Sequence, residues 1–221
     1  MNQLSTLQHI AIWALPVLFA ITIHEVAHGW VANKLGDPTA RMLGRLTLNP
    51  VKHIDLIGTI IVPGLLLILG GFIFGWAKPV PITWQNLKNP RRDIALVALA
   101  GPGSNFLMAL IWGAIAKMGM MLGPSTSMTA TLIVYMGFAG ISINLVLMTL
   151  NLIPIPPLDG SRVVSVFLKG RIAIAYSRIE QFGFWILLAL IFTGVLSYIM
   201  LPPLHFLQGL ILNLFGMSRG A

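Results

Sequence analysis

The sequence predicts an all-α membrane protein, a polytopic helical bundle with five or six membrane segments. Of its 221 residues, 57% are hydrophobic and 9% are charged, whereas soluble globular domains carry about 25% charged residues. The mean hydropathy is +0.87. The chain also contains five apolar stretches, and a helix needs about 20 apolar residues to cross a bilayer. Together these observations exclude a soluble enzyme, a disordered chain and a nucleic-acid-binding module.

The first four apolar stretches are each long enough for one helix. The first of them is interrupted by His24, Glu25 and His28, which are costly to place in an apolar segment unless they are paired or functional. The four stretches cover residues 11–31, 56–77, 94–116 and 128–150.

The fifth apolar stretch, residues 181–218, is long enough for two helices. It has no charged residue and contains the pair Pro202-Pro203. Because proline removes a backbone hydrogen bond from a helix, we expect the break at this pair. The predicted helices lie near 183–201 and 203–215, and we expect them to pack loosely and to act as a lateral gate. The alternative is that they only anchor the chain.

Basic residues predict the topology. Loops 34–53 and 78–92 are both rich in Lys and Arg, as is the connection after the fourth stretch, whereas 117–127 has only Lys117. If 56–77 crossed the membrane, its two basic flanks would face opposite sides, against the positive-inside rule. A re-entrant path, with bends at Pro63-Gly64 and Gly70-Gly71, would put every basic segment in the cytoplasm. We favour that path over an ordinary span.

The first stretch contains the motif His24-Glu25-Val26-Ala27-His28. Residues four apart lie on one face of a helix, so both imidazoles can reach one metal ion. Glu25 lies one step round the helix, where it can take a proton from water beside that ion. The chain has no cysteine, so any metal must be held by His, Asp or Glu. Zinc fits such a ligand set.

Two histidines leave a catalytic zinc site incomplete, because such sites usually have three protein ligands. Asp159 is the best candidate, since it follows three prolines that end a helix and fix an extended segment. The alternative is a solvated aspartate in a helix-terminating loop. The other candidates fit interfacial, capping or solvated positions better: His9, Asp37, His53, Asp55, Asp93, Glu180 and His205.

Two motifs together carry a resemblance to a known family. They are H-E-x-x-H at 24–28 and N-x-x-P-x-P-x-L-D-G at 151–160. The sequence thereby resembles the site-2 protease (peptidase M50) family of intramembrane metalloproteases, and in particular its small bacterial members without PDZ or CBS domains. The likeness runs from about residue 20 to about 165, and further matching stretches lie at 36–41, 43–50, 74–81 and 100–105.

The resemblance implies a role for each matching residue. His24 and His28 would be zinc ligands, Asp159 the third ligand and Glu25 the catalytic acid/base. Asn151 would help to position the substrate or to stabilise the oxyanion. In Gly101-Pro102-Gly103-Ser104-Asn105, close helix packing is a better explanation than catalysis, although Asn105 and Asn144 can hydrogen-bond within the core.

We therefore expect a zinc endopeptidase with one Zn²⁺ per chain that cleaves peptide bonds within or beside membrane segments. Its partners would be transmembrane proteins or peptides as substrates and membrane lipids, with no nucleic acid. It would be a multi-pass protein of the cell membrane whose active site faces the cytoplasm. Residues 1–221 would form one domain, with a catalytic core over about 8–165 and C-terminal helices over about 181–216.

Two other functions fit part of the pattern. Intramembrane His and Asp can form an ion path in a metal-ion transporter, but transporters tend to have repeated halves and this sequence shows no repeat. An inactive scaffold that binds membrane clients would tolerate the loss of Glu25, which is present here.

Overall fold

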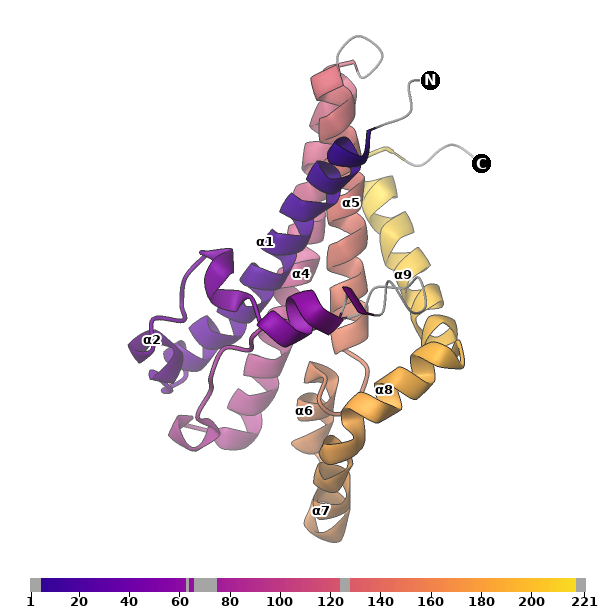
Figure 1. Cartoon of the computed structure of the whole chain (residues 1–221). Coiled ribbons are helices and arrows are strands. Elements are labelled where there is room, and N and C mark those ends of the chain that lie inside the picture. Colours follow the sequence, from indigo (N-terminus) through magenta and orange to yellow (C-terminus); the bar gives the residue numbers. More distant parts are fainter. Residues whose placement is uncertain (1–4, 63, 66–74, 124–127, 218–221) are drawn as a thin grey trace.

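The computed structural model describes residues 5–62, 64–65, 75–123 and 128–217, and every regular element within them is a helix. Five helical segments are long and apolar enough to cross a membrane (Figure 1). This confirms the predicted all-α membrane fold. The five segments are Leu7–Lys34, Pro90–Met121, Met128–Asn151, Gly170–Phe192 and Val195–Leu214.

Helices α1 (Thr6–Lys34), α4 (Pro90–Met121) and α5 (Met128–Asn151) form the central bundle. Both α1 and α4 begin earlier than the hydropathy pattern predicts. In α1 the reason is a capping box, in which Ser5 and Gln8 bond each other's backbone N–H groups. In α4 the reason is a proline at the first helical position, where its missing N–H has no partner to lose.

Small residues bring α4 and α5 into close contact. A Cβ atom at Gly140 of α5 would lie 2.1 Å from the Trp112 ring of α4, and one at Gly137 would lie 2.5 Å from Ala116 Cβ. Trp112 belongs to a buried cluster with Ile141 and other residues of α5. Close approach at small residues is how membrane helices gain packing energy without a hydrophobic driving force.

The chain continues through shorter elements into the C-terminal helices. They are α6 (Asp159–Ser165), α7 (Gly170–Ile179), η4 (Glu180–Phe182), α8 (Gly183–Phe192) and α9 (Val195–Leu214). The predicted break at Pro202-Pro203 is wrong, because both prolines lie inside α9. The break occurs at Gly194, whose φ is 74°. A left-handed glycine ends a helix, whereas proline removes an N–H but keeps a φ compatible with helix.

Packing of the C-terminal helices also differs from the expectation of uniform looseness. The second half of α9 is part of the core, since Ile211 is fully buried in the same cluster as Trp112. The first half of α9 and much of α8 are exposed, with Trp185, Phe192 and Tyr198 at 65%, 68% and 83% accessibility. The expected loose packing therefore applies only to α8 and the start of α9, and not to the second half of α9.

The two ends of the 56–77 stretch lie against each other. It begins as the π-helix η2 (Leu56–Ile61), and the Trp76 N–H donates to Gly58 O at 3.0 Å. The Thr59 hydroxyl donates to Trp76 O at 2.9 Å. Of the predicted bends at Pro63-Gly64 and Gly70-Gly71, only Gly64 lies within the described residues, and it is helical. Because its ends meet, the stretch leaves and returns on one side of the bundle.

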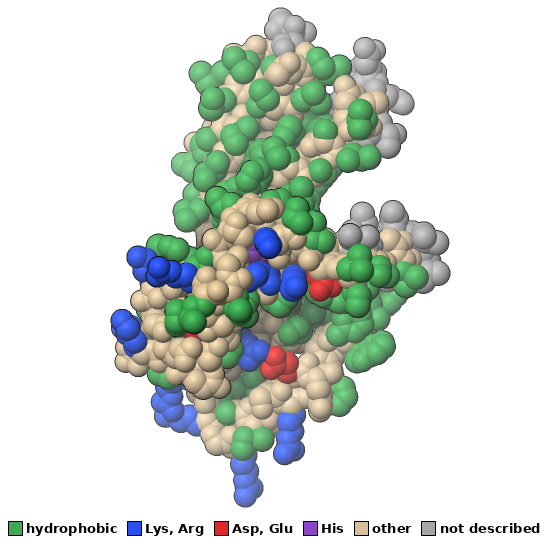
Figure 2. Space-filling view, turned by 60° about the vertical axis from the view of Figure 1, so that its left-hand side comes forward, with side chains coloured by type: hydrophobic (Ala, Val, Ile, Leu, Met, Phe, Trp, Pro, Cys, Tyr) green, Lys and Arg blue, Asp and Glu red, His purple; other side chains and the backbone are tan. Residues whose placement is uncertain are grey.

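Basic side chains gather at one end of the molecule. In Figure 2 they occupy the lower half, while the upper half of that face is almost entirely hydrophobic. Short elements between α1 and α4 lie in this region: α2 (Thr39–Met42), η1 (Pro50–His53) and η3 (Trp84–Asn86). An irregular segment, residues 75–83, precedes η3 and is called the strip below.

Candidate metal centre

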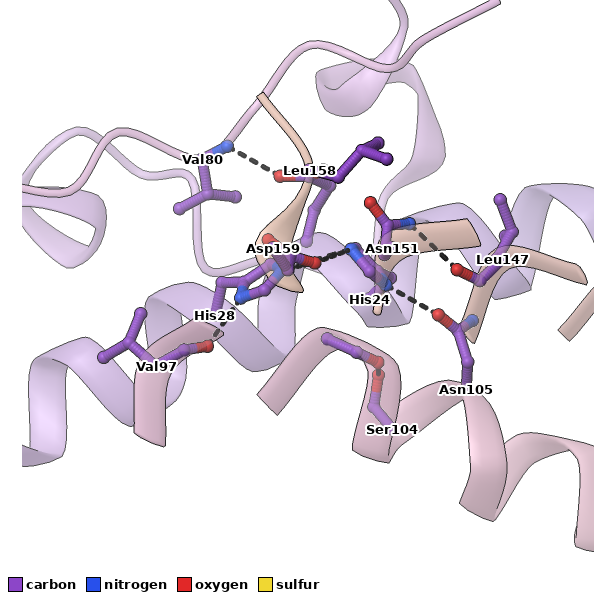
Figure 3. Close-up of polar contacts among 12 residues, drawn as sticks. His24, His28, Val80, Val97, Ser104, Asn105, Leu147, Asn151, Leu158 and Asp159 are labelled. Atoms are coloured by element: carbon purple, nitrogen blue, oxygen red, sulfur yellow. Dashed lines mark hydrogen bonds and ion pairs between the residues drawn. The ribbon is translucent and has the colours of Figure 1, made fainter. Parts of the chain in front are cut away.

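His24, His28 and Asp159 come together where α1 meets the start of α6 (Figure 3). The Nε2 atoms of the two histidines are 3.0 Å apart. Asp159 Oδ2 lies 3.2 Å from each of them. Among the described residues this is the one group of three or more His, Asp or Glu side chains placed to share a metal ion.

The other ring nitrogen of each histidine fixes where its proton lies. His28 Nδ1 is 2.7 Å from Val97 O, and His24 Nδ1 is 2.6 Å from Asn105 Oδ1. Both partners are oxygens that can only accept, so each Nδ1 carries the hydrogen. Both Nε2 atoms therefore direct lone pairs toward Asp159, which is the arrangement that metal-binding histidines need.

The carboxylate of Asp159 completes this set of acceptors. Apart from the two imidazole nitrogens, its buried Oδ2 has no polar partner. Three lone-pair-bearing atoms about 3 Å apart repel each other unless a cation lies among them. Neighbouring ligands of a tetrahedral zinc ion are about 3.3 Å apart, so the residues fit zinc.

Gly101 of α4 makes room for the two imidazoles. A Cβ atom at this position would lie 2.3 Å from His28 Nε2 and 2.6 Å from His24 Cε1. The sequence motif around Gly101 was expected to serve close helix packing. The structure shows that the packing partner of this glycine is the histidine pair itself.

Glu25 is held beside the histidines by the strip. The Val80 N–H donates to Glu25 Oε2 at 2.8 Å. The strip is in turn fixed by Arg45, whose guanidinium donates to Lys78 O and Pro79 O at 3.0 and 3.3 Å. Asp37 fixes its far end by accepting from the Thr83 N–H at 2.7 Å. One carboxylate oxygen of Glu25 is thus bound to the backbone and the other remains for chemistry.

A cavity of about 810 Å³ opens onto His24 and Glu25. Asn151 also lines it, and its side-chain amide donates to Leu147 O at 3.0 Å. The rest of the wall is mainly apolar. It comes from α1, α5 and α8 through Val17, Ile21, Ile143, Leu147, Phe184 and Leu187. The cavity can accept an apolar chain segment beside the predicted metal ligands.

The remaining candidates lie outside the three-residue group. His53 is buried and lies 3.0 Å from Thr47 O, and Glu180 pairs with Arg162 at 2.5 Å. Asp93 accepts from the Asn89 N–H at the start of α4 at 2.8 Å. Asn105 was considered only as a general core hydrogen-bonding residue, and its direct contact with His24 was missed. Its position one helical turn after Gly101 is the pattern that could have indicated it.

Comparisons with known proteins agree with this chemistry. Residues 113–194 match the model of peptidase family M50. "Putative zinc metalloprotease YwhC" of Bacillus subtilis (strain 168) is 38% identical over 205 residues, which cover 90% of this chain and 88% of that protein. "Putative zinc metalloprotease Rip2" of Mycolicibacterium smegmatis is 28% identical over 200 residues, or 89% of this chain and 73% of that protein. No solved structure matches the chain.

Proposed function

Because this chain belongs to peptidase family M50 and is a multi-pass zinc metalloprotease, we propose that it hydrolyses peptide bonds within or next to transmembrane segments of other proteins. The observation that carries the proposal is the position of the His24–His28–Asp159 group. His24 of this group and Glu25 line an apolar cavity walled by membrane helices. Such a cavity suits an apolar segment that has been drawn out of the bilayer.

We assign the metal to His24, His28 and Asp159. Their three facing atoms would hold one Zn²⁺, which when bound polarises the scissile carbonyl and makes water more acidic. The protein holds both imidazoles in the metal-binding tautomer through Val97 O and Asn105 Oδ1.

Glu25 would act as the general acid/base. Its carboxylate would accept a proton from the attacking water and later donate it to the leaving amine. The Val80 N–H holds Oε2, which orients the other oxygen without using it. The same backbone bond ties the position of the base to the position of the strip.

Asn151 would orient the substrate. One of its two amide hydrogens is bonded to Leu147 O, and an asparagine amide has a second N–H and a carbonyl oxygen to offer. Asn151 lies at the last turn of α5 and lines the cavity together with Glu25. A substrate carbonyl entering the cavity could accept from that second N–H.

We place the active site toward the cytoplasmic side of the cell membrane. His24 and His28 lie in the C-terminal third of α1, next to the end of the molecule where basic residues gather. Basic loops are retained in the cytoplasm. Substrates would then be cut near the cytoplasmic end of their membrane segment.

The test compares Glu25→Gln with the wild-type protein for zinc content and for cleavage of membrane substrates. The amide keeps the shape of glutamate but cannot take a proton, so zinc should stay while turnover falls at least about a hundredfold. His24→Ala is the control that should lose zinc as well. Wild-type turnover by Glu25→Gln would eliminate the proposed hydrolysis and favour a metal transporter or a client-binding scaffold.

A second test concerns the metal ligands one at a time. Alanine at His24, His28 or Asp159 should lower zinc occupancy, measured by elemental analysis of purified protein, because each supplies one ligand atom. Full zinc content and full activity in Asp159→Ala would show that the third ligand is another residue.

A further inference from the structure

The two histidines at the metal centre are oriented by different kinds of partner. His28 Nδ1 faces a backbone oxygen, Val97 O, which no substitution removes. His24 Nδ1 faces a side chain, Asn105 Oδ1, at 2.6 Å. The orientation of His24 therefore depends on the identity of one residue, and that residue lies on a different helix.

The Asn105 amide can lie only one way round. Its Nδ2 donates to Ala20 O at 3.2 Å and to Asn144 Oδ1 at 2.9 Å. Ala20 O is a backbone carbonyl and can only accept, so the nitrogen must face it. The carbonyl oxygen of the amide is thereby directed at His24.

The orientation of Asn144 is fixed in the same way. Its Nδ2 donates to Gly140 O at 2.9 Å, which leaves its oxygen for Asn105. Both asparagines are buried, with 1% and 0% of their surface exposed. In a low-dielectric interior a network of polar side chains is stable only when every member is hydrogen-bonded. Here each group donates to the next, from His24 through Asn105 and Asn144 to the backbone of α5.

From this geometry we infer that Asn105 is the positioning residue that holds His24 in its metal-binding tautomer and orientation. The inference rests on the proposed ligation by His24. A neutral imidazole has one N–H. The Asn105 oxygen accepts a hydrogen bond from Nδ1–H but cannot donate one to an unprotonated Nδ1. The tautomer of His24 with its proton on Nε2 would therefore lose this bond. Without Asn105, His24 would keep neither its tautomer nor its ring orientation.

The first experiment measures zinc affinity of the purified full-length protein by competition with a chelator. Asn105→Ala should bind zinc about 10–100-fold more weakly, which is the usual effect of removing the partner of a metal-binding histidine. Asn105→Asp should bind zinc more tightly than Asn105→Ala, because a carboxylate also accepts from Nδ1–H, although it cannot donate to Ala20 O and Asn144 Oδ1. Ser104→Ala is the matched control, since the Ser104 hydroxyl bonds Gly101 O within the same turn of α4 and should not affect zinc.

The second experiment observes the Nδ1–H protons by NMR in zinc-loaded protein. In the wild type, the His24 and His28 protons should both be shifted downfield and protected from exchange. Asn105→Ala should remove this signature from His24 alone, and Asn105→Asp should move the His24 proton further downfield because a carboxylate is a stronger acceptor. The His28 proton, bonded to Val97 O, is an internal control that should not move.

The outcomes separate this inference from the proposed function. If His24→Ala binds zinc as tightly as the wild type, the proposed ligation fails. If His24→Ala loses zinc while Asn105→Ala binds it normally and keeps the His24 signature, Asn105 is not a positioning residue. If Asn105→Ala does not fold, Asn105→Asp decides alone: an unmoved His24 proton overturns the inference.

Discussion

Gly101 determines how closely α4 approaches His24 and His28, the proposed metal ligands of α1. Any side chain there would occupy the space of the two imidazoles, since a Cβ would lie 2.3 Å from His28 Nε2. Neither ring can move away freely, because each is bonded through Nδ1 to a group on α4. Gly101, which has no side chain to bind a metal, thus controls whether the two imidazoles can come together.

Gly101→Ala should therefore abolish or strongly weaken zinc binding, by at least about tenfold, as expected when metal ligands are displaced. The matched control is Gly103→Ala in the same helix, where a Cβ would meet nothing within 4 Å. That control should bind zinc normally and gain about 0.5–1 kcal/mol of stability from the better helix former. Chelator competition on both purified variants measures the difference, and normal zinc binding by Gly101→Ala would contradict the close packing described here.

At the scale of elements, the strip connects the N-terminal loops to Glu25, the proposed catalytic base. Asp37 holds its far end by accepting bonds from Thr83 N–H and from the Asn86 side chain, at 2.7 and 2.9 Å. Burial alone would raise the pKa of Asp37, but the bonds from Thr39, Asn86 and Thr83 lower that pKa below its ordinary value of 3.8. The ionised carboxylate therefore stabilises the strip, and with it the Val80 N–H that orients Glu25.

Asp37→Asn should lower the free energy needed to open the strip by about 1–3 kcal/mol, because hydrogen bonds to a charged group are lost. Hydrogen exchange at the Thr83 and Val80 amides should become faster, and turnover should fall while zinc content stays normal. A carboxyl whose pKa is lowered in the folded protein stabilises the fold at every pH above its ordinary pKa. This stabilisation is lost as the pH falls through the folded-state pKa. Wild-type protection factors at Thr83 should thus decline below about pH 4, whereas those of Asp37→Asn should not change in that window. Unchanged exchange in the variant would exclude Asp37 as the anchor of the strip.

Helix α8 is the element best placed to control access to the cavity. Phe184 and Leu187 of α8 line its wall together with Ile21 of α1. The second half of α9, by contrast, is anchored in the core through Ile211. Movement of α8 about Gly194 and the region of Gly183 would widen the cavity without disturbing the bundle.

Cross-linking α8 to α1 should accordingly block cleavage of membrane substrates and leave zinc in place. The chain has no cysteine, so a bifunctional thiol reagent on an Ile21→Cys, Leu187→Cys double variant acts only there. The control joins α4 to the end of α9 at Gly113 and Phe215, since a Cβ at Gly113 would lie 2.7 Å from the Phe215 ring, and it should leave activity intact. Cleavage at the normal rate by the α1–α8 cross-linked protein would rule out the gate.

At the scale of the whole molecule, the contact between Gly58 and Trp76 determines whether the two basic loops, 34–53 and 78–92, lie on the same side. Their backbone bond of 3.0 Å places the two ends of the 56–77 stretch together. The Lys78 N–H also donates to His53 O at 2.9 Å, joining the two basic loops directly. Both loops therefore lie on one side, as the positive-inside rule requires.

Single cysteines at Thr47 and Gln85 should report the same side of the membrane. In oriented vesicles an impermeant thiol reagent should label both from the cytoplasmic face and neither from the opposite face. A cysteine at Gly123, beyond the other end of α4, is the control that should label from the opposite face. Labelling of Thr47→Cys and Gln85→Cys from different sides would mean that 56–77 crosses the membrane.

The sequence by itself determined the class of the molecule, its main helices and the first half of its metal centre. These properties depend on local patterns: apolar runs of membrane length, and a spacing of four that puts His24 and His28 on one helical face. The role proposed for Asn151 follows from the family motif alone. For Asp159, the three preceding prolines indicate a candidate third ligand but leave a solvated aspartate as the alternative.

Tertiary structure decided everything that joins distant segments. It placed Asp159 against α1, paired Asn105 with His24, set Gly101 under both imidazoles and brought the Val80 N–H to Glu25. It also decided that the helix breaks at Gly194, whereas Pro202-Pro203 continue it. The physical reason is that a hydrogen bond or a close contact between helices depends on their register and distance, and these result from packing of the whole bundle rather than from the residues on either helix alone.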